Sequence, residues 1–120
     1  MREVECPREL RAAAEAALDA CGVGDGHVSL GLVDADRIRA LNRAHRGIDA
    51  PTDVLSFPVD GGAPAAGPRE LGDVVICPEH TADLEEAVVH GVLHLLGMDH
   101  EADRGEMFAL QGRILGELRA

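Results

Sequence analysis

The segment HGVLHLLGMDH, residues 90–100, holds three of the six histidines of the chain. His90 and His94 are four residues apart, so a helix places both imidazoles on one face, one turn apart, where they can share a metal ion. Gly97 follows three residues later, and a glycine there can adopt a positive φ that turns the chain out of the helix. His100 can then return to the same point. The spacing therefore predicts a three-histidine metal site.

Three imidazole nitrogens supply three corners of a tetrahedron and leave the fourth open to water, as in catalytic zinc sites and unlike closed structural ones. We therefore expect one Zn²⁺ ion, although imidazole ligands also suit nickel and copper. The alternative is that these are ordinary polar histidines of a helix without a metal. The third histidine and the intervening glycine disfavour that alternative, and the flanking valine and leucines supply an apolar shell.

The same spacing occurs in the metalloprotease motif HExxHxxGxxH, in which a glutamate after the first histidine is the general base. Here that position is Gly91, which has no side chain. A peptidase built on this site would lack its base, so the sequence argues against proteolysis.

Hydrophobic periodicity extends the interpretation to the rest of the chain. Helices are expected over residues 7–21, about 35–44, from Thr81 or Asp83 to about Leu96, and roughly 101–118. Alternation predicts strands over 27–33, 54–57 and 71–77, with a further edge strand possible at 2–5. Residues 60–68, DGGAPAAGP, are expected to form a mobile surface loop. This order predicts an α+β fold in one domain (1–120): a small mixed sheet of three or four strands with four or five helices and the metal site in the C-terminal half.

The net charge is −11, from 22 acidic and 11 basic residues. A basic surface supplies most of the affinity in nonspecific nucleic-acid binding, so this balance counts against it. A polyanion would need a local cationic site, whereas a basic protein partner suits the overall charge. The three cysteines form no CxxC pair, which argues against a disulfide framework or a cysteine zinc site. With no apolar stretch near 18 residues and no apolar signal region, we expect a cytoplasmic protein that does not enter membranes.

Three segments together resemble the YbeY family. LNRAHRGIDAPTDVLSFP at 41–58 is similar to the family's LNxxYRxxDxPTDVLSFP block, LGDVVICPE at 71–79 to its strand block, and HGVLHLLGMDH at 90–100 to its HGxLHLxGYDH signature. The three motifs occur in the family's order, and the resemblance spans roughly residues 28–115.

The resemblance implies an α+β fold related to the zincins, one zinc on His90, His94 and His100, and endoribonuclease activity on single-stranded RNA. It further implies roles in maturing the 3′ end of small-subunit rRNA and in ribosome quality control, with ribosomal small-subunit proteins or an assembly GTPase as partners. By position, the functional arginine of the first block falls on Arg46, so Arg46 and His94 are the candidate catalytic residues. The chain departs from the family at His45, where an aromatic residue is usual, and in the short stretch before His90.

Several individual roles are hypotheses with a plainer alternative. Arg46 would bind a phosphate bidentately, or it is a solvated surface arginine. Asp99 would orient a histidine or cap the last helix. Asp53 bonds its own loop or supports the site, and Asp73 faces solvent or shapes the site. His45 is a proton carrier or an exposed substitute for the aromatic ring, and no residue is identified as a general base.

Two functions of different classes follow. The first is a zinc-dependent endoribonuclease acting on rRNA, which the open fourth ligand position favours. The second is a ribosome-assembly factor that binds ribosomal proteins, with a structural zinc and little nuclease activity, which the charge favours.

Overall fold

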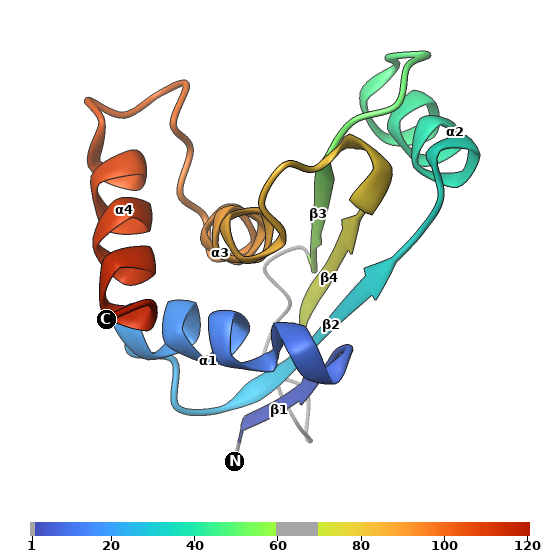
Figure 1. Cartoon of the computed structure of the whole chain (residues 1–120). Coiled ribbons are helices and arrows are strands. Elements are labelled where there is room, and N and C mark those ends of the chain that lie inside the picture. Colours follow the sequence, from blue (N-terminus) through green and yellow to red (C-terminus); the bar gives the residue numbers. More distant parts are fainter. Residues whose placement is uncertain (1, 60–69) are drawn as a thin grey trace.

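The computed structural model describes residues 2–59 and 70–120, whose strands and helices are shown in Figure 1. The strands are β1 (Arg2–Glu5), β2 (Gly26–Leu32), β3 (Val54–Pro58) and β4 (Glu70–Ile76). The helices are α1 (Arg11–Ala20), α2 (Ala35–Arg46), α3 (Leu84–Leu95) and α4 (Glu106–Leu118), with short 3₁₀ turns at Arg8–Leu10 and Pro78–His80. The predicted α+β class, the possible edge strand and the C-terminal position of the histidines are confirmed.

The four strands form one mixed sheet in the order β1-β2-β4-β3. β1 and β2 are parallel and are joined through α1, and β2 is also parallel to β4. β3 runs antiparallel to β4 and forms the other edge, with Leu55 opposite Val75 and Ser56 opposite Val74. This register fixes which side chains of β3 face α3, and hence one wall of the site.

Helices α1 and α3 cover one face of the sheet, and α4 packs against both of them (Figure 1). Because the chain has no Trp or Tyr and only two Phe, its core depends on close approach of small side chains. Ala14 and Ala17 of α1 and Val92 of α3 are fully buried in this layer. A second, smaller cluster beneath α2 consists of Ile38, Leu55 and Cys77.

The predicted start of the last helix is wrong. Residue 101 lies in a turn, and α4 begins only at Glu106. The carboxylate of Asp103 accepts hydrogen bonds from the backbone N–H groups of Gly105 and Met107, so it holds this segment in a turn before the helix starts. Helix α2, by contrast, runs two residues beyond its predicted end and includes Arg46, because Gly47 with φ 73° ends it only there.

The expected mobile loop at 60–68 lies outside the described residues. Within the described part of the chain, no helix has the length and apolar character that crossing a membrane requires.

Candidate metal centre

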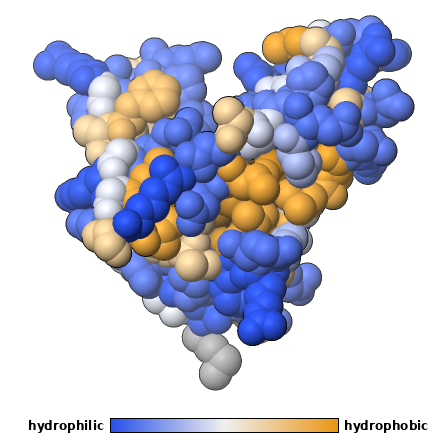
Figure 2. Space-filling view, viewed as in Figure 1, coloured by the Kyte–Doolittle hydropathy of each residue, from blue (hydrophilic) through white to orange (hydrophobic). Residues whose placement is uncertain are grey.

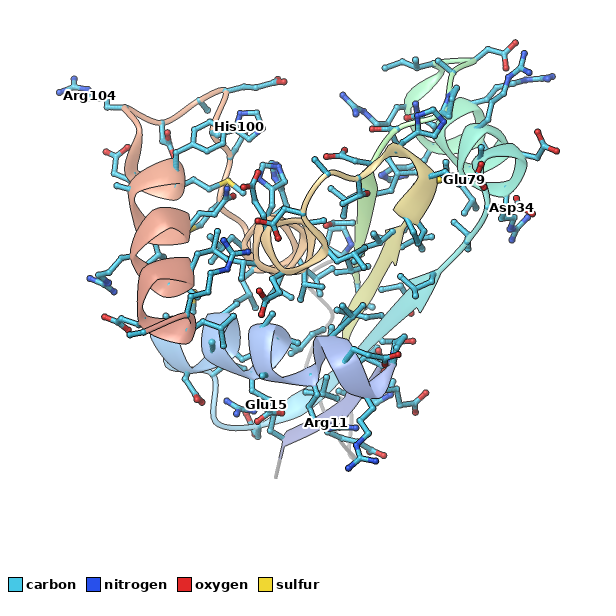
Figure 3. The ribbon with its side chains drawn as sticks, viewed as in Figure 1. Arg11, Glu15, Asp34, Glu79, His100 and Arg104 are labelled. Atoms are coloured by element: carbon cyan, nitrogen blue, oxygen red, sulfur yellow. The ribbon has the colours of Figure 1, made fainter. Side chains whose placement is uncertain are left out.

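His90, His94 and His100 come together as the sequence predicts. One ligand nitrogen from each lies within 4.8 Å of the other two. His90 and His94 project from α3, while Gly97, with φ 101°, turns the chain so that His100 reaches the same point. In Figure 3 the His100 side chain lies in the segment between α3 and α4, whereas Arg104 points away at the outer corner of that segment.

The chemistry of the three side chains fits a divalent metal ion. Burial, and then repulsion from the imidazoles of His90 and His100, lowers the pKa of His94. A lowered pKa keeps His94 neutral near pH 7, which is the form that binds a metal. The three rings are only partly buried, so the shared point remains open on one side.

Helix α4 supplies a support that sequence reasoning missed. Nδ1 of His90 lies 2.8 Å from Oε1 of Gln111, a side chain that is only 8% exposed. If Nδ1–H donates to that oxygen, Nε2 of His90 is left to bind the metal. The signal in the sequence was a polar residue on the otherwise apolar stripe that contains Met107 and Ile114.

Gly91 lies against the sheet and not against the metal site. A Cβ built at Gly91 would stand 2.5 Å from Cγ1 of Val74 and 3.0 Å from Cγ2 of Val54. The hydroxyl of Ser56 donates to the carbonyl oxygen of Gly91 at 2.7 Å and ties β3 to the same turn of α3. The position that carries glutamate in metalloproteases therefore has no room for one here, which supports the argument against a peptidase.

A cleft of about 640 Å³ opens above the histidines. Figure 2 shows the molecule hollowed between an arm that ends in α2 and an arm that ends in the segment before α4. Polar side chains predominate along it. Those that line it are His45, Arg46, Thr52, Asp53, Ser56, His90, His94, Asp99, His100 and Glu101.

Arg46 stands in this cleft with the histidines, although 44 residues separate it from His90 in the sequence. It is the last residue of α2 and is exposed. Arg39, two turns earlier, forms an ion pair with Asp49, with 2.8 Å between Nε and Oδ1. Arg46 forms no ion pair with any residue in 2–59 or 70–120. Of the four arginines of α2, Arg46 alone lines the cleft, where it stands with the carboxylates of Asp53, Asp99 and Glu101.

The hypotheses on the acidic residues are resolved by their contacts. Asp99 accepts a hydrogen bond from the backbone N–H of Glu101 at 2.9 Å, and within the described residues it bonds no histidine. Asp99 does not cap α4 either, because Gly105 is the N-cap residue of that helix. Both roles proposed for Asp99 are therefore wrong. The side chain that bonds a histidine of the site is that of Gln111. The carboxylate of Asp53 accepts a hydrogen bond from the backbone N–H of Val54 in its own loop, which is one of its two proposed roles, and Asp53 also lines the cleft. Asp73 is exposed.

His45 lines the cleft and lies beside Phe57, with ring centroids 4.5 Å apart. This contact is the one that an aromatic residue at position 45 would make. It supports the interpretation of His45 as a substitute for that ring.

Fold and site together define an α+β protein with three histidines that could hold a metal ion, at the base of an open cleft. A model of the family described as Endoribonuclease YbeY matches residues 2–119. The chain therefore belongs to the YbeY endoribonuclease family, and the resemblance inferred from three motifs is confirmed.

Similar proteins cover nearly the whole chain. A protein named Endoribonuclease YbeY from Salinispora tropica is 45% identical, with 91% of this chain and 85% of the relative covered. One of the same name from Pelotomaculum thermopropionicum is 46% identical over 91% of this chain and 84% of its own length. The solution structure of TM1509 from Thermotoga maritima matches 98% of this chain and 87% of its own, with a TM-score of 0.56 and 31% identity.

Proposed function

We propose that this protein is a zinc-dependent endoribonuclease that cuts single-stranded RNA in the cleft above His90, His94 and His100. The observation that carries the proposal is the shared cleft, in which an open three-imidazole site faces an arginine without an ion-pair partner among the described residues. The relatives named Endoribonuclease YbeY support it. By the same resemblance, the substrate is the 3′ end of small-subunit rRNA, cut during maturation and ribosome quality control in the cytoplasm.

The residues divide the work as follows. The three histidines hold the ion, which when bound supplies a Lewis acid and a water of lowered pKa. Gln111 orients His90 through Nδ1. Arg46 binds two oxygens of the phosphodiester and stabilises the negative charge that develops on the phosphorus oxygens during cleavage.

The charge of the chain sets how substrate is held. A net charge of −11 repels RNA over most of the surface, so the metal and Arg46 form a short attractive region and not a long track. Delivery of the substrate by a basic partner compensates for the weak affinity of the protein for RNA. We propose ribosomal small-subunit proteins or an assembly GTPase for this role.

The same charge favours a second candidate function, that of an assembly factor which binds ribosomal proteins and uses zinc only to stabilise its fold. In that case Arg46 and the open side of the site would have no catalytic use. The two candidates differ in one observable, which is RNA cleavage that depends on an intact metal site.

The test is cleavage of single-stranded RNA containing the small-subunit rRNA 3′ end by the wild type and His94→Ala, purified side by side with their zinc content measured. We expect the wild type to cut and His94→Ala to be inactive. Equal cutting by both would assign the activity to a contaminant. No cutting by a zinc-loaded wild type, alone and with small-subunit proteins added, would favour the assembly factor.

A further inference from the structure

One large apolar side chain beside the metal centre has no part in the core. Phe108 lies in the first turn of α4 and is 51% exposed, while its neighbour Met107 is fully buried. Its ring centroid lies 4.8 Å from that of His100 and 6.0 Å from that of His90. It is one of two phenylalanines in a chain without Trp or Tyr.

We propose that Phe108 is a stacking platform for a base of the RNA whose phosphate is bound at the three histidines. The proposal rests on the proposed function and adds a binding residue to it. Aromatic side chains stack on the faces of unpaired bases with little dependence on sequence. A base inside a duplex has both faces covered, so Phe108 gives the site its preference for single strands.

The position of Phe108 suits this role. It stands next to His100, which forms one side of the cleft, whereas Arg46 comes from α2 on the other side. Phe108 is not one of the residues that line the cleft, but its ring lies against that of His100 at the α4 edge, next to a phosphate bound between the histidines and Arg46. The base attached to that phosphate, or to the next one along, lies within reach of the ring.

Stacking also suits the charge of the protein. A chain with net charge −11 gains little from contacts to successive phosphates. A neutral aromatic surface adds affinity for single-stranded RNA without needing further positive charge.

A structural role for Phe108, in which the ring merely holds His100 in place, makes different predictions. A leucine would preserve much of that apolar contact but offers no flat face to a base. We expect Phe108→Leu to raise KM for single-stranded RNA roughly tenfold, with kcat and zinc affinity nearly unchanged, and Phe108→Tyr to restore KM. If leucine preserved KM, or if zinc were lost in parallel with activity, the stacking role would be refuted.

The composition of the chain allows a direct test of stacking. In Phe108→Trp the introduced indole is the only Trp or Tyr fluorophore of the protein. We expect a single-stranded DNA hexamer, added to the zinc-loaded full chain, to quench this fluorescence, and the same hexamer in a duplex to leave it unchanged. Leu32→Trp is the matched control, because Leu32 is 43% exposed at the end of β2, a strand that β4 separates from β3 and the cleft.

The readouts separate this proposal from the proposed function. Quenching at position 108 but not at position 32 supports stacking, whether or not the protein cuts RNA. Absence of quenching, or equal quenching by duplex and single strand, overturns stacking, even if wild-type cleavage establishes the nuclease.

Discussion

The amide oxygen of Gln111 lies 2.8 Å from Nδ1 of His90, so a residue of α4 fixes the orientation of a ligand that projects from α3. The bond couples the packing of the last helix to the geometry of the metal site. Metal-binding histidines commonly donate their second nitrogen to such a partner, which selects the tautomer and raises ligand basicity.

Loss of this bond should weaken metal binding without unfolding the protein. For Gln111→Leu, which keeps the apolar contacts of the side chain, we expect zinc affinity to fall about 10- to 100-fold. Competition with a chromophoric chelator measures it. Arg113→Ala, at an exposed position of the same helix, is the control and should bind zinc as the wild type does. Unchanged affinity in Gln111→Leu would remove Gln111 from the site.

A methyl group at Gly91 should destabilise the protein. In Gly91→Ala the new Cβ would stand 2.5 Å from Cγ1 of Val74, so α3 must move away from the sheet. Overpacking of this kind costs about 1–3 kcal/mol in free energy of unfolding. Gly112→Ala is the matched control in α4, because a Cβ there meets nothing within 4 Å and alanine favours a helix by up to about 1 kcal/mol.

Urea denaturation at one pH, with zinc in excess, measures both changes. We expect Gly91→Ala to lower the urea concentration at the unfolding midpoint and Gly112→Ala to raise it or leave it unchanged. Equal midpoints for wild type and Gly91→Ala would mean that α3 does not approach the sheet as closely as described.

Much of the metal site could be predicted because its determinants are local. The spacing of His90 and His94 needs only the helical repeat, and Gly97 needs only the conformational freedom of glycine to bring His100 back. Strand alternation likewise depends on near neighbours, so the sheet was predicted to within about one residue at most ends.

Other features of the site depend on contacts between distant residues. Gln111, which sequence reasoning missed, meets His90 across 21 residues. Arg46 was indicated by the family resemblance alone, and it lines the cleft as the last residue of α2. The start of α4 was misplaced because Glu101 and Ala102 suit a helix, while the side chain of Asp103 bonds the backbone of the following residues and delays it. Hydrophobic periodicity reports neither these long-range contacts nor the hydrogen bonds of Asp103.

No sequence motif predicted a role for His27. In the structure it bridges two strands, with Nε2 2.8 Å from Glu5 and Nδ1 2.8 Å from Glu70. Hydrogen bonds to the carboxylates of Glu70 and Glu5 raise its pKa to about 9. The folded state therefore holds a proton on His27 that the unfolded chain releases near pH 6.5.

The sign of the pH dependence follows. The pKa of His27 is higher in the folded state, so its contribution to stability is complete below about pH 6.5 and is lost as the pH rises to about 9. Because both carboxylates are largely exposed, we expect a loss of about 1 kcal/mol. The measurement is the difference in unfolding free energy between wild type and His27→Gln at pH 6 and pH 9.5. A difference that does not shrink with pH would contradict the bridge.

Arg46 should affect catalysis and not metal binding. It is exposed at the end of α2 and makes no ion pair within the described residues, so Arg46→Ala should leave folding and zinc content unchanged. Loss of a group that stabilises developing charge lowers kcat about 100- to 1,000-fold. Arg46→Lys keeps the charge but loses the bidentate geometry, so we expect only partial recovery.

Arg43→Ala is the matched control, because Arg43 lies on the same exposed helix but does not line the cleft. We expect Arg43→Ala to reduce cleavage only slightly and mainly at low salt, where the general field of α2 is least screened. Full activity in Arg46→Ala would exclude a role in phosphate binding. An equal loss in both variants would mean that α2 acts through its total charge, and a loss confined to Arg46 would identify a specific phosphate contact opposite the three histidines.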